Sequence, residues 1–160
     1  MPKLTLTIDS NLNNVSLVGV SIQGLCMLTP LSPEITHDVQ LCVVESINNV
    51  IEHSYANQTG YQVVITVYLF NDRIMLDIVD TGKGMDEQLR QVVNAPYIKS
   101  PSESELPEGG WGLYIIKSKM DEVTYHTIDN THILRLVKLF SPHSSLEKSV
   151  EGEFNKINLA

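Results

Sequence analysis

The sequence predicts an α+β fold, a two-layer α/β sandwich in which a mixed, mostly antiparallel sheet carries its helices on one face. Segments that alternate between apolar and polar residues follow one another directly along the chain, as the strands of hairpins do. Longer segments with a helical apolar period separate these hairpins. The 160 residues, of which 42% are hydrophobic and 19% charged, suit one globular domain with its own core.

The first strand and the two helices that follow it are predicted from alternation and from capping residues. Alternation over residues 4–8 predicts a half-buried strand, and an apolar stripe predicts a helix over residues 12–28. A longer helix is expected over residues 33–54. Ser32 is its candidate N-cap and Pro33 its first helical residue, because proline lacks only an N–H that is unpaired there anyway.

Two hairpins account for the remaining strands. Residues 62–69 and 74–80 both alternate and are separated by a short Asn-Asp turn. Residues 123–127 and 133–140 repeat this arrangement around a second turn, Asp-Asn. Strands that neighbour each other in sequence pair antiparallel, and the prediction of a mostly antiparallel sheet depends on this rule.

The segments between and after the hairpins complete the predicted architecture. Residues 85–93 can form a short helix, and residues 110–120 a second one. Between them, residues 94–109 are rich in Pro, Ser, Glu and Gly, and a loop of this length is either a lid or disordered. The domain is expected to span residues 1–140, and residues 141–160 to form a polar C-terminal tail.

Composition and charge exclude several classes of function. A net charge of −8 argues against nucleic-acid binding and against an anionic membrane surface, because both require clustered Lys and Arg. A local site can still bind phosphate through backbone N–H groups. Cys26 and Cys42 lie in apolar runs, which favours buried free thiols over a disulfide. With no signal sequence and no apolar stretch of about 18 residues, a cytoplasmic protein is expected.

Three polar side chains share one stripe of the long predicted helix. Glu45, Asn49 and His53 are spaced four residues apart, and each such step turns a helix by only about 40°. Any amphipathic helix has a polar face, so solvation alone accounts for the pattern. The same three side chains could instead hold a metal–phosphate group, with the carboxylate acting as a base.

Asp80 stands at the end of its predicted strand with the parity of the buried residues. A carboxylate on that face is costly unless a donor satisfies it. An adenine base could donate through its exocyclic amine. Alternatively, Asp80 caps the glycine-rich turn that follows, a common role of Asp before glycine.

Glycines form two clusters, which are separated by the long loop. Gly82 and Gly84 follow the first hairpin, and Gly110 and Gly112 open the last helix. Glycine lets backbone approach a ligand closely, and a helix N-terminus favours a phosphate, although both clusters also suit simple turns. Lys99, the only basic residue of the loop, could reach a phosphate or be merely solvated. Neither cluster fits a P-loop or a Rossmann fingerprint.

These segments together resemble the sequence boxes of the GHKL ATPases, the superfamily of gyrase, histidine kinases and MutL. Residues 45–55 read Glu-x-x-x-Asn-x-x-x-His-x-Tyr and resemble the N-box. Residues 80–84 read Asp-Thr-Gly-Lys-Gly and resemble the next box. Residues 109–113 read Gly-Gly-Trp-Gly-Leu and resemble the glycine box after the ATP lid, and Thr131 resembles the adenine-side Thr. The resemblance covers about residues 3–140.

Within that superfamily, the chain looks like the anti-sigma-factor serine kinases of bacterial partner-switching systems. The resemblance implies a Bergerat ATP-binding fold, ATP and Mg²⁺ as cofactors, and transfer of phosphate to a serine of an anti-anti-sigma (STAS-type) protein. It also implies regulation of a sigma factor or another effector, and a homodimer. Two alternatives stay open: a non-catalytic ATP-binding interaction module, and the detached catalytic domain of a split histidine kinase.

The resemblance also implies roles for individual residues. Asn49 would coordinate Mg²⁺, Glu45 would act as general base toward the serine hydroxyl, and His53 would assist near the phosphates. Asp80 would accept from the adenine amine, with Thr131 nearby. The other cofactor-binding residues would come from the glycine-rich segments and the loop: Gly82, Gly84, Lys99, Gly110, Gly112 and Leu113.

Overall fold

The structure is a computed structural model that describes residues 1–95 and 111–141. The centre of the fold is a five-stranded sheet with the strand order β1-β2-β3-β5-β4. All four neighbouring pairs are antiparallel. The predicted α+β fold class is confirmed, and the sheet is antiparallel throughout rather than mixed. The strands are β1 (Lys3–Asp9), β2 (Gln62–Leu69), β3 (Arg73–Asp80), β4 (Glu122–Ile128) and β5 (Thr131–Leu139).

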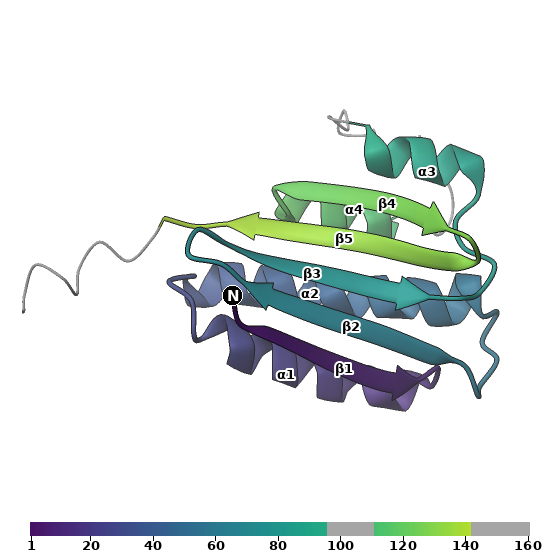
Figure 1. Cartoon of the computed structure of the whole chain (residues 1–160), viewed down its shortest axis with the longest axis horizontal. Helices are drawn as coiled ribbons and strands as arrows, with labels where there is room; N and C mark the ends of the chain where they lie inside the picture. Colours follow the sequence, from purple (N-terminus) through teal and green to yellow (C-terminus); the bar gives the residue numbers. More distant parts are fainter. Residues whose placement is uncertain (96–110, 142–160) are drawn as a thin grey trace, which may run out of the picture.

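Helices cover one face of this sheet, as predicted. Helices α1 (Val15–Cys26), α2 (Pro33–Asn49) and α4 (Trp111–Lys119) lie behind the sheet in Figure 1. Helix α3 (Glu87–Asn94) lies beyond β4, at the edge of the sheet. The opposite face of the sheet carries no helix among the described residues. The arrangement is a two-layer sandwich.

The core lies between the sheet and the helical layer. Because side chains alternate along a strand, every second residue of β2 and β3 faces the helices. Asp80 continues the parity of Ile78 in β3 and is only 5% exposed, so the predicted burial of its carboxylate is confirmed. The largest fully buried side chains include Ile22, Ile47, Ile51, Ile65, Ile74, Leu76, Ile78, Ile116 and Leu136.

The start of α2 follows from its sequence. The hydroxyl oxygen of Ser32 accepts a hydrogen bond from the N–H of Ile35 at 3.2 Å, and Pro33 is the first helical residue. The predicted cap is therefore confirmed. The predicted helix over residues 12–28 is shorter than expected, because a separate 3₁₀ turn, Leu12–Asn14, precedes α1.

The end of the predicted helix 33–54 differs from a regular helix. Its α-helical part stops at Asn49 and continues as a π turn, Val50–Ser54, in which the N–H of Tyr55 donates to the carbonyl of Val50 at 2.9 Å. A π turn changes the direction of every side chain that follows, and such turns are frequent at functional sites. Here the π turn brings Ser54 to the segment that follows β3.

The two cysteines have the state that the sequence predicts. Cys26 and Cys42 are free and buried, as expected, and burial raises the pKa of their thiols to about 11 and about 12. Both thiols therefore stay protonated at neutral pH.

Across residues 1–95 and 111–141, none of the helices has the length and hydropathy needed to cross a bilayer. Residues 96–110, including Lys99 and Gly110, and the tail from residue 142 lie outside the described residues.

Candidate functional site

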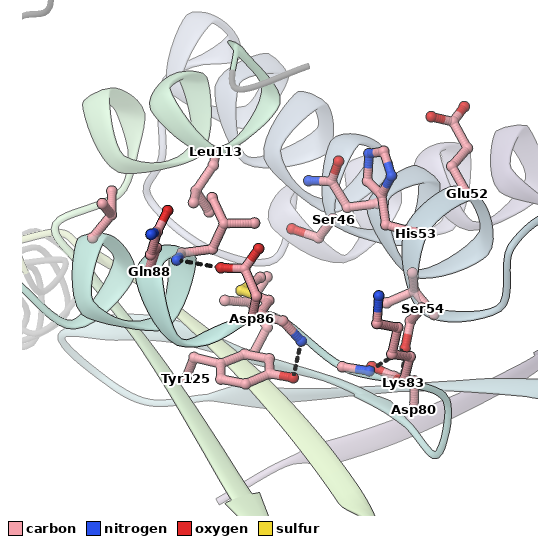
Figure 2. Close-up of a pocket in the computed structure, with 17 residues that line it drawn as sticks. Ser46, Glu52, His53, Ser54, Asp80, Lys83, Asp86, Gln88, Leu113 and Tyr125 are labelled. Atoms are coloured by element: carbon pink, nitrogen blue, oxygen red, sulfur yellow. Dashed lines mark hydrogen bonds between the residues drawn. The ribbon is translucent and has the colours of Figure 1, made fainter. Parts of the chain in front are cut away.

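A pocket of about 670 Å³ lies where the end of α2, the π turn, the segment after β3, α3 and the start of α4 meet (Figure 2). This volume suits a ligand of nucleotide size. Five residues predicted from the sequence line the pocket: Asn49, His53, Asp80, Gly84 and Leu113. Lys83, the lysine of the Asp-Thr-Gly-Lys-Gly segment, also lines the pocket. Lining residues that the sequence did not single out are Ser46, Val50, Glu52, Ser54, Met85, Asp86, Gln88, Leu89, Val92, Tyr125 and Leu134.

Asp80 supplies the buried polar group of this pocket. Its Oδ1 accepts hydrogen bonds from the hydroxyl of Ser54 at 2.5 Å and from the N–H of Gly82 at 2.9 Å. Among the contacts of the described residues, its Oδ2 accepts none. Among the described residues, the one buried side-chain N or O atom without a partner is Arg90 Nε, so Asp80 Oδ2 is not sealed off inside the protein. Because Asp80 lines the pocket, this oxygen can accept a hydrogen bond from a ligand that donates. Capping of the turn uses one oxygen and leaves the other for a ligand, so the two roles of Asp80 are compatible.

The turn after Asp80 uses its own backbone donors inside the protein. Each of the five consecutive N–H groups of residues 81–85 has an intramolecular acceptor. These acceptors are, in order, the Tyr55 hydroxyl, Asp80 Oδ1, the Ser54 carbonyl, the Ser54 hydroxyl and the Tyr125 hydroxyl. The N–H groups of Gly82 and Gly84 are therefore not available to a phosphate, and the turn contributes the shape of the pocket instead.

Glycine is required in this turn because other parts of the protein approach it closely. A Cβ on Gly82 would lie 2.5 Å from the carbonyl oxygen of Ser54. A Cβ on Gly84 would lie 2.5 Å from the imidazole of His132, and Gly84 also has φ +72°, a conformation that favours glycine. The close approach predicted at these glycines exists, and it is to Ser54 and His132.

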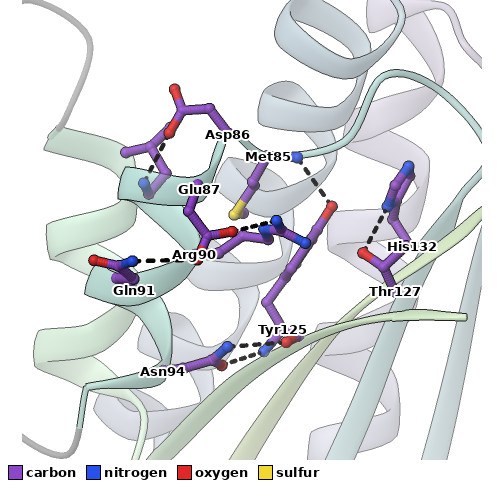
Figure 3. Close-up of polar contacts among 10 residues, drawn as sticks. Met85, Asp86, Glu87, Arg90, Gln91, Asn94, Tyr125, Thr127 and His132 are labelled. Atoms are coloured by element: carbon purple, nitrogen blue, oxygen red, sulfur yellow. Dashed lines mark hydrogen bonds and ion pairs between the residues drawn. The ribbon is translucent and has the colours of Figure 1, made fainter.

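His132 stands directly opposite Asp80 in the β3–β5 register. Its Nε2 lies 3.1 Å from the carbonyl of Gly82, which can only accept, so Nε2 carries a proton. Its Nδ1 lies 3.1 Å from the Thr127 hydroxyl, and its ring stacks on Tyr125 with centroids 6.0 Å apart (Figure 3). His132 thus contacts the turn at Gly82 and lies against Gly84.

Thr131 does not lie where the adenine-side threonine was expected. Side chains alternate along β5, so Thr131 points to the sheet face opposite to that of His132 and Asp80. It does not belong to the pocket lining. Leu134 and Leu136 are buried, and His132 belongs to the same alternate set of residues in β5. This alternation could have predicted from the sequence that His132 lies on the same face of the sheet as these two leucines.

The predicted stripe on α2 reaches the first turn of α4. A Cβ on Gly112 would lie 3.0 Å from Glu45 Oε2 and 3.4 Å from Asn49 Nδ2. Both side chains are half-buried, whereas His53 is exposed in the π turn. The structure therefore brings Glu45, Asn49 and Gly112 together, with Asn49 in the pocket lining and Glu45 beside it.

The described residues contain no group of three or more His, Cys, Asp or Glu side chains placed to hold a metal ion. Mg²⁺ does not require such a group, because it is commonly bound by one or two protein oxygens together with phosphate oxygens and water. Asn49 lines the pocket, and the Glu45 carboxylate lies beside it at Gly112. The amide oxygen of Asn49 fits a metal that arrives with a nucleotide.

The end of α3, which precedes the long loop, is fixed by two polar side chains that the sequence did not reveal. The side-chain amide of Asn94 bonds both the carbonyl and the N–H of Tyr125, at 3.1 and 2.8 Å (Figure 3). The ammonium of Lys117 in α4 donates to the carbonyls of Val93 and Ala95 at 2.7 and 2.5 Å, and burial lowers its pKa. These contacts hold the α3 wall of the pocket against α4 and β4.

Replacing Gly84 with Ala is expected to destabilise the fold more than the same change at Gly60. Both glycines have positive φ, so each variant meets backbone strain of about 1–2 kcal/mol. Only at residue 84 does the new methyl group also overlap His132, which adds about 1–3 kcal/mol. Urea unfolding of the two variants measures the difference. Equal losses would show that His132 does not close over the turn.

The antiparallel α+β sandwich brings a buried aspartate, a glycine turn and the Glu–Asn stripe of α2 together around one pocket. The family model for the histidine kinase-like ATPase domain matches residues 8–138, and the chain belongs to this family.

Curated relatives carry the name serine-protein kinase RsbW. The protein of Listeria innocua is 26% identical over 121 residues, covering 76% of this chain and 77% of its own. That of Bacillus subtilis is 28% identical over 109 residues, covering 68% of each.

A solved structure shares the fold at lower sequence similarity. The RsbU and RsbW domains of Rv1364c from Mycobacterium tuberculosis superimpose with a TM-score of 0.61 at 16% identity. The match covers 89% of this chain and 34% of that one.

Proposed function

We propose that the protein is a serine kinase of the anti-sigma type. It binds Mg-ATP, phosphorylates a serine of an anti-anti-sigma (STAS-type) partner, and thereby controls a sigma factor or another effector by partner switching. Its active form is a homodimer. The observation that carries the proposal is the Asp80 carboxylate, which is buried in the pocket and has one oxygen that accepts no hydrogen bond from the described residues. The relatives of this chain are named serine-protein kinases.

Nucleotide binding depends on the deep part of the pocket. Asp80 Oδ2 accepts a hydrogen bond from the exocyclic amine of adenine, while Ser54 and Gly82 hold Oδ1 in place. Val50 and Leu113 supply apolar surface for the base. A base without a donor at that position would leave a buried carboxylate unpaired, which favours adenine over guanine.

Phosphoryl transfer uses the residues at the α2–α4 contact. Bound ATP supplies the γ-phosphoryl group, and Asn49 holds the accompanying Mg²⁺. Glu45 lies beside the pocket lining and accepts the proton of the partner's serine hydroxyl as general base. Lys83 is the one Lys or Arg among the described lining residues and supplies positive charge near the phosphates, which phosphoryl transfer requires. Lys99, proposed for the same purpose, lies outside the described residues.

Release of the phosphorylated partner follows from charge. Phosphorylation adds a charge of about −1.5 to −2 to the partner serine. The protein itself has a net charge of −8, so the modified partner is repelled. The freed kinase then binds its other partner.

Incubation with labelled Mg-ATP and candidate anti-anti-sigma proteins tests the proposal. We expect label on the partner that survives acid treatment, because phosphoserine is stable in acid. Label that acid removes indicates phosphohistidine and would identify a split histidine kinase instead. Partner binding that responds to ATP without any label would identify the non-catalytic module. Either of these outcomes overturns the serine-kinase proposal.

A further inference from the structure

The sheet face that turns away from the helices, here called the outer face, is not covered by any helix of the described residues (Figure 1). A sheet face that stays in water usually carries polar side chains. Here the three central strands, β2, β3 and β5, present two apolar rows to this face. The first row is Val64, Val79 and Ile133, and the second row is Tyr68, Met75 and Val137.

A polar row lies between the two apolar rows and is paired within the sheet. Thr66, Asp77 and Arg135 stand opposite one another in the same registers. Arg135 donates two hydrogen bonds of 2.7 Å to the Asp77 carboxylate, which is buried. Because this carboxylate already has its donors, the surface that the outer face offers to a partner is mainly apolar.

The apolar side chains of the outer face remain partly open to water. All members of the two rows except the buried Val137 are half-buried. Leu139, which ends β5 on the same face, is 47% exposed, and Ile128 at the end of β4 is 62% exposed. A contiguous apolar surface of this kind marks contact with another segment or molecule.

The sequence after β5 contains a segment that matches this surface. Ser144 and Glu147 have the spacing of a capping box, which starts helices. The apolar residues that follow are spaced by four, four and three positions: Leu146, Val150, Phe154 and Ile157. On a helix they fall within about 80° and form one stripe. Gly152 lies on the other side and weakens an isolated helix, so such a helix depends on packing for its stability.

The length and the starting point of this segment also fit. Strand β5 ends at Leu139, and the Ser141-Pro142 pair that follows favours a turn. The two apolar rows are four residues apart along each strand, which corresponds to about 14 Å. Leu146 and Ile157 are 11 residues apart, or about 16 Å along a helix. A helix that returns along β5 can therefore reach both rows.

We propose that residues 145–157 form a helix that packs on the outer face, antiparallel to β5. Leu146 contacts the second row, and Phe154 and Ile157 contact the first row. Val150 crosses the polar row, and Glu151 beside it accepts a hydrogen bond from Arg135, whose side chain is 41% exposed. The folded unit then extends to residue 157 instead of ending at residue 140.

This helix leaves the candidate ATP site open. The pocket lies on the side of the sheet that faces α2 and α4, and the outer face is the opposite side (Figure 1). The proposal therefore does not depend on nucleotide binding or on phosphoryl transfer. Its test can fail while the kinase assay succeeds, and the reverse also holds.

Nuclear Overhauser contacts in the full-length protein test the docking directly. We expect contacts between the Phe154 ring and the methyl groups of Val79 or Ile133, and between Leu146 and Val137. Amide exchange in residues 148–157 should be at least about tenfold slower than in an unstructured peptide. Random-coil shifts with unprotected amides across residues 145–157 would overturn the proposal, and so would contacts of this segment with a different surface.

Two neighbouring substitutions show whether the apolar stripe holds the helix in place. Phe154→Ser should raise the amide exchange rate of residues 148–157 about tenfold, whereas Asn155→Ser, on the opposite side of the helix, should leave it unchanged. Ile133→Thr should release the segment in the same way as Phe154→Ser, and the signals of the buried core report that each variant is folded. Equal exchange rates in the Phe154 and Asn155 variants would contradict docking through this stripe.

Discussion

Replacing Glu45 with Gln is expected to slow serine phosphorylation by about 10²–10⁴-fold, the usual contribution of a general base. The amide keeps the size of the side chain beside Gly112 and Asn49 but cannot take up the serine proton. ATP affinity should stay within about threefold of wild type, because Glu45 does not line the pocket. Single-turnover phosphorylation at saturating ATP, together with an ATP titration, measures both effects.

Glu52→Gln is the matched control for this variant. Glu52 belongs to the pocket lining, so its replacement removes the same negative charge near the nucleotide. Glu52 lies in the π turn, after Asn49. We expect its variant to retain most of the phosphorylation rate. Equal losses in the two variants would indicate a general effect of charge, and Glu45 would not be the base.

Replacing Asp80 with Asn should weaken ATP binding about 10- to 100-fold, which corresponds to the loss of a charge-assisted hydrogen bond of about 1.5–3 kcal/mol. The Asn carbonyl can still accept from Ser54 and Gly82, so the turn should stay folded. Only the outer oxygen becomes a donor, which opposes the donating amine of adenine. The single tryptophan, Trp111, begins α4 next to Gly112 and can report the titration by fluorescence.

Asp86→Asn serves as the control for that variant. Asp86 also lines the pocket, but it caps α3 by accepting from the N–H of Leu89, and asparagine caps a helix equally well. Its ATP affinity should change less than about twofold. If both asparagine variants bound ATP alike, the adenine amine would not be bound at Asp80.

Most of the architecture could be predicted from local patterns. Alternation gave the parity that buries Asp80, and spacing of four placed Glu45 and Asn49 side by side on α2. Ser32 and Pro33 marked the start of that helix. These features depend on residues close together in the sequence, where strand and helix periods decide which side chains share a face.

The features that could not be predicted from the sequence depend on contacts between segments that lie far apart along the chain. The π turn places Ser54 where it meets residues 26 and 30 positions later, which no local period indicates. Neighbouring residues of a strand face opposite sides of the sheet, so His132 shares a face with Asp80 and Thr131 does not. The close approach of backbone at Gly82 and Gly84 was predicted, but the groups that approach them, Ser54 and His132, come from distant segments and could not be named from the sequence.

Calorimetric titration of the wild-type protein tests the central claim most directly. ATP, GTP and buffer would be compared with and without Mg²⁺. We expect saturable binding of one ATP per chain, stronger with Mg²⁺. GTP should bind at least about tenfold more weakly, because guanine presents a carbonyl where adenine donates to Asp80. Absence of ATP binding under both conditions, or equal affinity for GTP, would contradict the assignment of this pocket as an ATP site.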